Sequence, residues 1–448
     1  MASLPLITHA SPGSIIAWYG DYAITRNQFL ADVEQLAALL PSSGHILNVC
    51  SDRYHFSVGV AAAMVTGKIS ILPPSLTPMM IRQLKAFAPD IFCLSDSDTC
   101  SVDLPQLRYP TNPAESTTVL AIPQIPSSQC VAVVFTSGST GAPLPHNKSW
   151  GALVSSVQAE ALSLGLTDSS KHFTLIGTVP PQHMYGFEST VLMAWQNGHA
   201  LSTTQPFYPA DICQALANAA TPRVLISSPV HLRALLDAEL TIPELACVIS
   251  ATAPLSQTLA LEIEQHCNAP LMEIYGCTET GLIATRRPAQ SLAWQLLPEI
   301  ALTVEADHVY ASGGHIATKT IMSDIIEPLT DRHFLLHGRL ADMVNIAGKR
   351  HSLASLNHLL NTIPGVLDGV FYMPDETSQT RATRLAAFVV APNVSQTQLL
   401  EALREQIEPI FLPRPLMFVD ALPRNNTGKL PYAALQTLFN QMRNTRGA

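Results

Sequence analysis

Residues 135–141 read Phe-Thr-Ser-Gly-Ser-Thr-Gly and directly follow the apolar run Val131-Ala132-Val133-Val134. The apolar run predicts a buried strand, and the small residues after it predict a loop. In such a loop, glycines let the backbone approach a ligand, while hydroxyl and backbone N–H groups can hold phosphate oxygens. Apolar residues then recur at helical spacing from Trp150. The order strand, loop, helix is typical of a nucleotide-phosphate site, although a Ser/Thr-rich turn has the same composition.

Three further segments follow this loop. They read Ile-Tyr-Gly-Cys-Thr-Glu-Thr-Gly at 274–281, Gly-Arg-Leu-Ala-Asp-Met-Val-Asn-Ile-Ala-Gly-Lys-Arg at 338–350 and Leu-Pro-Arg-Asn-Asn-Thr-Gly-Lys-Leu at 422–430. In this order they resemble the adenylate-forming superfamily of acyl- and aryl-CoA synthetases, peptide-synthetase adenylation domains and luciferases. The resemblance covers about residues 19–435. It implies that ATP and Mg²⁺ serve to activate a small carboxylic acid as an acyl-adenylate, which is then transferred to a thiol.

The pattern of elements predicts an α/β fold. Short apolar runs such as 224–226, 247–250 and 271–275 alternate with helical patterns, which indicates layers with mostly parallel sheets. The remainder of the chain predicts a smaller α+β unit. The resemblance implies a large N-terminal adenylation body at 1–341 and a mobile C-terminal domain at 342–448, with Asp342 at the hinge.

By the same resemblance, the first loop holds the β- and γ-phosphates of ATP. Its residues are Thr136, Ser137, Gly138, Ser139, Thr140 and Gly141. The family usually has a lysine soon after this loop, where this chain has Leu144. We expect Lys148 to replace the missing cation at the ATP site, with a solvated lysine at the start of a helix as the alternative.

The segment at 274–281 supplies further expected contacts. The resemblance implies that Tyr275 packs on adenine, Thr278 contacts the α-phosphate and Glu279 binds Mg²⁺. A hard cation requires such an anionic oxygen ligand. For Glu279 alone, an acidic residue at a helix N-terminus is the alternative. Thr252 belongs to the segment 251–254, Ala-Thr-Ala-Pro, which resembles part of the adenine pocket.

Asp324 and Arg339 are the expected ribose contacts. Asp324 lies fourteen residues before Gly338. At this spacing the family has an aspartate that accepts hydrogen bonds from both ribose hydroxyls. The usual Thr-Gly-Asp is here Met-Ser-Asp, so the match depends on spacing. Arg339 is expected to assist the ribose or a phosphate, with a surface arginine as the alternative.

Two more residues complete the expected catalytic set with Thr278. Lys429 matches the family's catalytic lysine, whose flexible ammonium can contact the acid carboxylate and the α-phosphate together. His183 matches a position where an aromatic ring walls the acyl pocket and gates the thiol tunnel. A histidine of the core is the alternative for His183.

The composition restricts the class of partner. The net charge of −9 argues against nucleic acid, and no apolar run approaches the roughly 18–20 residues that span a bilayer. The N-terminus lacks the features of a signal peptide, so we expect a cytoplasmic protein. The eight cysteines show neither zinc spacing nor a disulfide framework. Cys277 lies inside a motif but has no adjacent base, so we do not expect it to be a nucleophile.

We expect the acceptor thiol to be on an acyl carrier protein, with CoA as the alternative. Residues 343–448 carry 10 Lys+Arg and 7 Asp+Glu, whereas the preceding residues carry 15 and 27. A basic C-terminal region suits an acidic carrier protein. The alternative is that this uneven distribution of charge along the chain is a random fluctuation. The cations expected to steer the carrier are Lys349, Arg350, Arg414 and Arg424.

The segments 148–150 and 348–353 give a finer resemblance. With the short chain, they are similar to stand-alone ligases of aryl-polyene and related pigment pathways, which load an acyl or aryl group onto carrier protein. A catalytically degenerate fold that only binds nucleotide is a further alternative. Leu144 favours this alternative, whereas Glu279, Asp324 and Lys429 oppose it.

Overall fold

A computed structural model describes residues 2–114, 118–137, 143–253, 255–306, 308–339, 343–346, 349–374, 384–425 and 428–446. Several expected residues lie outside these ranges, namely Gly138, Ser139, Thr140, Gly141, Asp342 and Gly348. The side chains of Ser137, Arg339, Lys349 and Arg350 are likewise not described.

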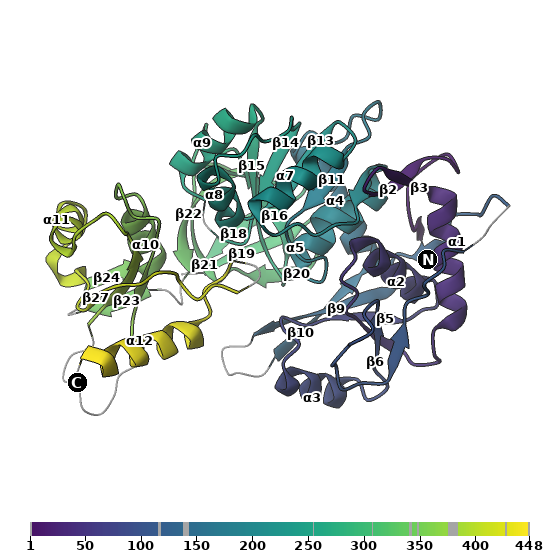
Figure 1. Cartoon of the computed structure of the whole chain (residues 1–448), viewed down its shortest axis with the longest axis horizontal. Helices are drawn as coiled ribbons and strands as arrows, with labels where there is room; N and C mark the ends of the chain where they lie inside the picture. The colour runs from purple at the N-terminus through teal and green to yellow at the C-terminus, as the bar shows by residue number, and fades with distance from the viewer. Residues whose placement is uncertain are drawn as a thin grey trace.

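A six-stranded sheet forms one half of the N-terminal body (Figure 1), in the order β10-β9-β5-β4-β6-β7. Its strands are β4 (His45–Asn48), β5 (Ile69–Leu72), β6 (Phe92–Ser95), β7 (Gln106–Arg108), β9 (Cys130–Ser137) and β10 (Pro143–Ser149). All pairings in this sheet are parallel except that of β10 with β9. The parallel part follows from the near-continuous apolar runs, because parallel sheets are covered on both faces.

An eleven-stranded sheet forms the other half, in the order β21-β22-β17-β16-β15-β14-β13-β11-β12-β2-β3. Its strands are β2 (Ile15–Tyr19), β3 (Tyr22–Thr25), β11 (Thr174–Gly177), β12 (Ala200–Ser202), β13 (Arg223–Ser227), β14 (Cys247–Ser250), β15 (Leu271–Cys277), β16 (Gly281–Arg286), β17 (Trp294–Leu296), β21 (Asp324–Pro328) and β22 (His333–Arg339). The centre of the sheet, from β2 to β15, is parallel, and the strands from β15 to β21 are antiparallel.

Helices cover both sheets. They are α1 (Arg26–Leu39), α2 (Arg53–Val65), α3 (Pro78–Phe87), α4 (Trp150–Ser163), α5 (Met184–Gly186), the π-helix η1 (Phe187–Leu192), α6 (Met193–Asn197), α7 (Pro209–Asn218), α8 (Pro229–Asp237) and α9 (Gln257–Cys267). Trp150 of α4 and Trp195 of α6 are fully buried between the layers. Smaller sheets join β1 (Ser3–Pro5) with β8 (Gln124–Pro126), and β18 (Ala301–Glu305) with β19 (His308–Gly313) and β20 (Ile316–Ile321).

The C-terminal part lies to one side of the body (Figure 1). It contains β23 (Met343–Ile346), β24 (Lys349–Ser352), α10 (Leu353–Asn361), β25 (Asp368–Tyr372), β26 (Ala386–Val390), α11 (Gln396–Gln406), the 3-10 helix η3 (Pro409–Phe411), β27 (Leu416–Phe418) and α12 (Tyr432–Arg446). Two apolar clusters, around Phe371 and around Phe388, give this part its own core. The predicted α/β class with a smaller C-terminal domain is confirmed.

The predicted order strand, loop, helix is wrong in one respect. A second strand, β10, returns antiparallel to β9 before α4 begins at Trp150. Pro143 and Pro145 hide this strand in the sequence, and the sheet tolerates them because β10 is its edge strand. The candidate phosphate loop therefore lies between the two strands of a β-hairpin, β9 and β10. Ser149 then caps α4 by accepting from the Ala152 N–H at 3.4 Å.

Within the described ranges, no helix is both long and apolar enough to cross a membrane. The eight cysteines are all free thiols. Burial raises the pKa of Cys277, whose thiol contacts the Thr280 hydroxyl at 3.2 Å. A protonated thiol is a poor nucleophile.

Candidate active site

The expected nucleotide residues gather where parallel strands of the large sheet end. The carboxyl ends of neighbouring parallel strands lie at one edge of a sheet, and ligands of open α/β sheets bind beyond that edge. Thr252 follows β14, and Thr278 follows β15. Thr252 has a φ of +80°, which is unusual for a β-branched residue and is a form of local strain that clusters at functional sites.

Tyr275 and Asp324 meet although they are 49 residues apart in the sequence. The Tyr275 hydroxyl donates a hydrogen bond of 2.6 Å to Asp324 Oδ2. The tyrosine ring packs against Trp294, at a centroid distance of 5.4 Å, and against Phe334, at 5.9 Å. Arg339 is the partner of Asp324 in the antiparallel pair β21–β22. The fold thus brings the expected adenine and ribose residues to one place.

Glu279 lies in the turn between β15 and β16, with 42% of its side chain exposed. Its Oε1 is 3.7 Å from His146 Nε2, which is also 3.0 Å from Thr136 Oγ1. His146 therefore links the start of the candidate phosphate loop to the candidate metal ligand. The exposed carboxylate fits Mg²⁺, which binds one or two carboxylates and completes its shell with phosphates and waters. Among the described residues, no cluster of three or more His, Cys, Asp and Glu side chains could hold a metal.

Lys148 of β10 is 8% exposed, which excludes the solvated lysine that the sequence left open. Its Nζ donates a hydrogen bond to the backbone carbonyl of Thr278. Leu144, which occupies the family's usual lysine position, is 53% exposed. The basic side chains of β10 that approach the site are therefore Lys148 and His146. Sequence reasoning missed His146, because its role becomes visible only once 143–149 is recognised as a strand with alternating faces.

The positive charge of Lys429 acts on His183 of the body. The pKa of His183 is lowered to about 4, mainly by burial and in smaller part by the charge of Lys429. The segment that carries Lys429 also touches the start of α8, since a Cβ on Gly428 would lie 3.4 Å from Val230 Cγ2 and 3.6 Å from Ser228 Oγ. The charge of the expected catalytic lysine thus acts on the expected acyl-pocket histidine, and the lysine's turn packs against the start of α8.

A network of hydrogen bonds holds the turn before Lys429. Asn425 accepts from the Lys429 N–H through Oδ1 at 2.9 Å and donates its own N–H to the Lys429 carbonyl at 2.9 Å. Arg424 donates to both Asp368 oxygens, at 2.8 and 2.7 Å, and to the Gly428 carbonyl at 2.7 Å. The expectation that Arg424 is a steering cation is therefore wrong, because its guanidinium is engaged and its side chain is only 22% exposed.

The start of α2 supports the segment that leads to His183. The fully buried Arg53 donates to the carbonyls of Gly177 and Val179 at 3.0 and 2.8 Å. Gln182 Nε2 donates to the Cys50 carbonyl at 2.7 Å. These bonds tie the chain between β11 and α5 to the six-stranded half of the body.

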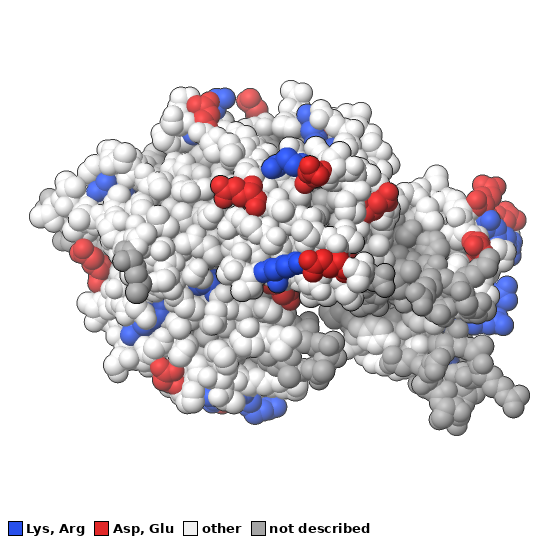
Figure 2. All heavy atoms as spheres, turned by 180° about the vertical axis from the view of Figure 1, so that it is seen from behind, with Lys and Arg blue, Asp and Glu red and all other residues white. Residues whose placement is uncertain are grey.

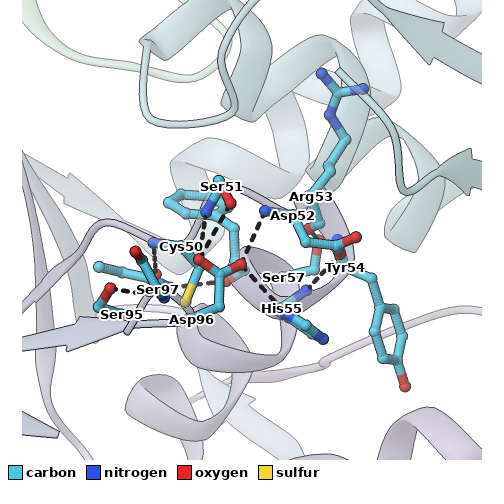
Figure 3. Close-up of polar contacts among 12 residues, drawn as sticks. Cys50, Ser51, Asp52, Arg53, Tyr54, His55, Ser57, Ser95, Asp96 and Ser97 are labelled. Carbon is cyan, nitrogen blue, oxygen red and sulfur yellow. Dashed lines mark hydrogen bonds and ion pairs between the residues drawn. The ribbon is translucent and has the colours of Figure 1, made fainter. Parts of the chain in front are cut away.

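Figure 3 shows what fixes the start of α2 itself. The Asp96 carboxylate accepts the backbone N–H groups of Ser51 and Asp52, each at 2.9 Å, and lies 3.1 Å from His55 Nδ1. The Arg53 side chain points away from Asp96 toward other elements of the body. This cluster is thus a structural support, with its polar groups used internally.

Comparison with known proteins then identifies the family. The sequence profile of the AMP-binding enzyme family matches residues 9–310, and that of the AMP-binding enzyme C-terminal domain matches 357–429. The chain belongs to the AMP-binding enzyme family. Its relatives include a 4-coumarate–CoA ligase of Halorhodospira halophila, 30% identical over 302 residues that cover 66% of this chain and 73% of the relative.

Other relatives of this AMP-binding enzyme have similar names. A 4-coumarate–CoA ligase of Rhodobacter capsulatus is 30% identical over 307 residues, covering 68% of this chain and 75% of the relative. A 3-hydroxybenzoate–CoA/4-hydroxybenzoate–CoA ligase of Thauera aromatica is 23% identical over 369 residues. The match covers 68% of this chain and 66% of the relative.

Solved structures share the fold over nearly the whole chain. One is an o-succinylbenzoate CoA synthetase (MenE) from Bacillus subtilis in complex with the acyl-adenylate intermediate OSB-AMP. It has a TM-score of 0.80 and 19% identity, with 97% of this chain and 99% of that chain covered. The ATP-bound MatB from Rhodopseudomonas palustris has a TM-score of 0.82 and 16% identity, with 97% of each chain covered.

Proposed function

We propose that this AMP-binding enzyme is an acid–thiol ligase that activates a carboxylic acid with ATP and transfers the acyl group to a phosphopantetheine thiol. The observation that carries the proposal is the 2.6 Å hydrogen bond between Tyr275 and Asp324, close to the turn after β15 that bears Thr278 and Glu279. Family membership supports the same chemistry.

In the first half-reaction, a carboxylate oxygen of the acid attacks the α-phosphorus of ATP, and the bond to the β-phosphate oxygen breaks to release pyrophosphate. Lys429 stabilises the charge that shifts from the carboxylate to the α-phosphate, because its ammonium can contact both. The Thr278 hydroxyl binds the α-phosphate. When bound at Glu279, Mg²⁺ supplies neutralising charge for the phosphates.

We infer the remaining nucleotide contacts from the family resemblance. Tyr275 packs on adenine near Thr252, and Asp324 accepts the ribose hydroxyls with help from Arg339. The hydrogen bond between Tyr275 and Asp324 supports this assignment, because it holds both side chains at one location. The β- and γ-phosphates bind the loop of Thr136, Ser137, Gly138, Ser139, Thr140 and Gly141.

In the second half-reaction, the thiol sulfur attacks the acyl carbon, and the bond from that carbon to the AMP oxygen breaks. The C-terminal domain rotates about Asp342, which withdraws Lys429 and presents Gly348 and the residues after it; such gating is common in enzymes. His183 walls the acyl pocket as an uncharged ring at neutral pH, since its pKa is about 4.

An aryl acid is the proposed substrate class, since several relatives are named as coumarate or hydroxybenzoate ligases. The test is ATP–pyrophosphate exchange with a panel of hydroxybenzoates, hydroxycinnamates and fatty acids. We expect exchange that depends on an added aryl acid. A folded protein that binds ATP but shows no acid-dependent exchange would instead be the degenerate binding module.

An acyl carrier protein is the proposed thiol donor, and the basic balance of residues 343–448 supports it. Of the cations expected to steer the carrier, Arg414 is exposed. CoA is the second candidate, because the names of the relatives favour it. Holo carrier protein should give a higher kcat/KM than free CoA, with a rate that falls as salt rises. A higher kcat/KM for CoA would identify a CoA ligase. A cytoplasmic location stays a prediction.

A further inference from the structure

Lys148 connects the two large sheets at the candidate active site. It lies on β10, the edge strand of the six-stranded sheet, and its Nζ donates to the Thr278 carbonyl beyond β15 of the eleven-stranded sheet. Thr278 and Glu279 belong to the turn between β15 and β16, called here the 278–281 turn. The ammonium of Lys148 thus holds the backbone of the turn that bears both expected ligand side chains.

A buried acidic side chain lies against the same turn. Glu188 of η1 is 6% exposed, and burial raises its pKa while the charge of Lys148 acts to lower it. A Cβ on Gly281 would lie 3.6 Å from Glu188 Oε1, so the carboxylate lies against the last residue of the 278–281 turn. Removing a charge from water is costly, and the attraction of the Lys148 charge offsets part of this cost for the Glu188 carboxylate.

The 278–281 turn is fitted closely to its surroundings at both ends. Gly281 has a φ of +72°, and a Cβ there would lie 3.3 Å from His315 Nε2. His315 is buried, and its Nε2 has no hydrogen-bond partner among the described residues. Two residues before Lys148, and thus on the same face of β10, His146 lies 3.7 Å from Glu279. β10 therefore contacts both the backbone and the carboxylate of this turn.

We propose that Lys148 is a positioning residue that holds the 278–281 turn and so places Thr278 and Glu279 for adenylation. The inference rests on the proposed function, because only adenylation gives the positions of Thr278 and Glu279 a catalytic purpose. It changes the role expected from the sequence: Lys148 serves the ATP site through the Thr278 carbonyl, with its ammonium engaged by the protein.

Lys68 provides a matched control for this inference. It is also 8% exposed, and its Nζ donates to a backbone carbonyl, that of Ser43, at 2.8 Å. Ser43 precedes β4 and Lys68 precedes β5, so this bond joins the amino ends of two strands of the six-stranded sheet. Lys148→Met and Lys68→Met therefore remove the same type of interaction, and only the first removes it from the candidate site.

The first experiment is amide hydrogen exchange of the ligand-free protein. Lys148→Met should speed exchange at residues 277–281 by at least about tenfold, since an opened turn loses its protection. Lys68→Met should leave these amides unchanged. Equal protection of the turn in wild type and Lys148→Met overturns the proposal. This readout does not require activity, so it separates failure of the inference from failure of the proposed function.

The second experiment uses Lys148→Met/Glu188→Gln, which removes both buried charges and so keeps the fold if Lys148→Met alone loses it. The double variant should recover stability but still show fast exchange at 277–281. In acid-dependent ATP–pyrophosphate exchange, its half-maximal Mg²⁺ concentration should rise about tenfold, while that of Lys68→Met stays at the wild-type value. A double variant with the wild-type Mg²⁺ requirement and a protected turn would show that Lys148 is structural only.

Discussion

In the proposed mechanism, Lys429 is the residue on which the adenylation step depends most. Lys429→Ala should lower acid-dependent pyrophosphate exchange on the order of 10²–10³-fold, the effect of removing one preorganised charge-stabilising group. Thioester formation from supplied acyl-adenylate should survive much better, because the proposed domain rotation withdraws the lysine in that step. Lys85, in a surface pair with Asp103, provides the control, and Lys85→Ala should leave both rates unchanged. Equal loss of both half-reactions in Lys429→Ala would contradict this role.

Glu279 makes a second prediction at the residue scale. Glu279→Gln should raise the Mg²⁺ concentration needed for half-maximal exchange by about tenfold or more, because an amide oxygen is a weaker ligand for a hard cation. Thermal unfolding should barely change, since the side chain is 42% exposed. Glu262, which pairs with Arg233 on α8, provides a control in Glu262→Gln. A Mg²⁺ titration that matches wild type would remove Glu279 as the ligand.

Single residues inside motifs could be named from the sequence, but their contacts could not. Tyr275 and Asp324 were both expected at the nucleotide, yet the hydrogen bond between them depends on strands that are distant in sequence. The charge of Arg424 alone suggests a steering cation. Its bidentate contact with Asp368 could not be predicted, because it depends on where β25 lies in the fold. Charge is a property of the residue, whereas availability of that charge depends on tertiary contacts.

At the scale of elements, the Arg424–Asp368 pair connects β25 to the turn that carries Lys429. Asp368→Ala should lower adenylation on the order of tenfold, with smaller changes in KM for ATP, because a small misplacement of a catalytic group is costly. The exposed pair Lys85–Asp103 again provides a control, in which Asp103→Ala should have no effect. An unchanged rate in Asp368→Ala would show that the turn needs no such support.

The parallel strands were the elements most visible in the sequence. The expected strand at 247–250 agrees with β14 (Cys247–Ser250), because its residues are all buried and apolar or small. β10 was missed, since its prolines and polar residues are typical of a loop and are tolerated only at an edge. The antiparallel strands β16, β17, β21 and β22 were likewise not foreseen as part of the large sheet, because the pairing of β17 with β22 joins segments that are distant in the sequence.

At the scale of the whole molecule, buried carboxyl groups make stability depend on pH. Burial raises the pKa of Glu160 to about 8, from an ordinary value of 4.5. The folded protein therefore keeps a proton that the unfolded chain loses, so this residue makes the fold less stable as pH rises from about 4.5 to 8. Glu160→Gln keeps the acceptor for the Ser189 hydroxyl, which donates to Oε1 at 2.6 Å, and has no proton to lose.

The urea midpoint of Glu160→Gln, followed by fluorescence of the buried tryptophans, should therefore rise relative to wild type as pH increases. The difference in unfolding free energy should grow by up to about 1.4 kcal/mol per pH unit between pH 5 and 8. Glu262→Gln should show no such trend, because Glu262 is partly exposed and paired. A constant difference between Glu160→Gln and wild type across this range would mean that Glu160 is ionised in the fold.

The distribution of surface charge affects how an acidic carrier protein would associate with this enzyme. On the face that Figure 2 shows, Lys and Arg lie in small groups intermixed with Asp and Glu, and most of the described surface carries no charge. A net charge of −9 therefore does not take the form of one large acidic surface on this face. Steering of an acidic carrier would depend on a few local cations, which supports a moderate and salt-sensitive effect on association.

The central claim is that the acid's own oxygen becomes bonded to the α-phosphorus. An acid labelled with ¹⁸O in its carboxylate, with ATP and a thiol acceptor, tests this claim most directly by mass spectrometry of the nucleotide product. The account predicts AMP that carries one ¹⁸O per turnover, because the carboxylate oxygen that attacks phosphorus leaves with AMP when the thiol attacks the acyl carbon. Unlabelled AMP, or ADP as the product, would contradict it.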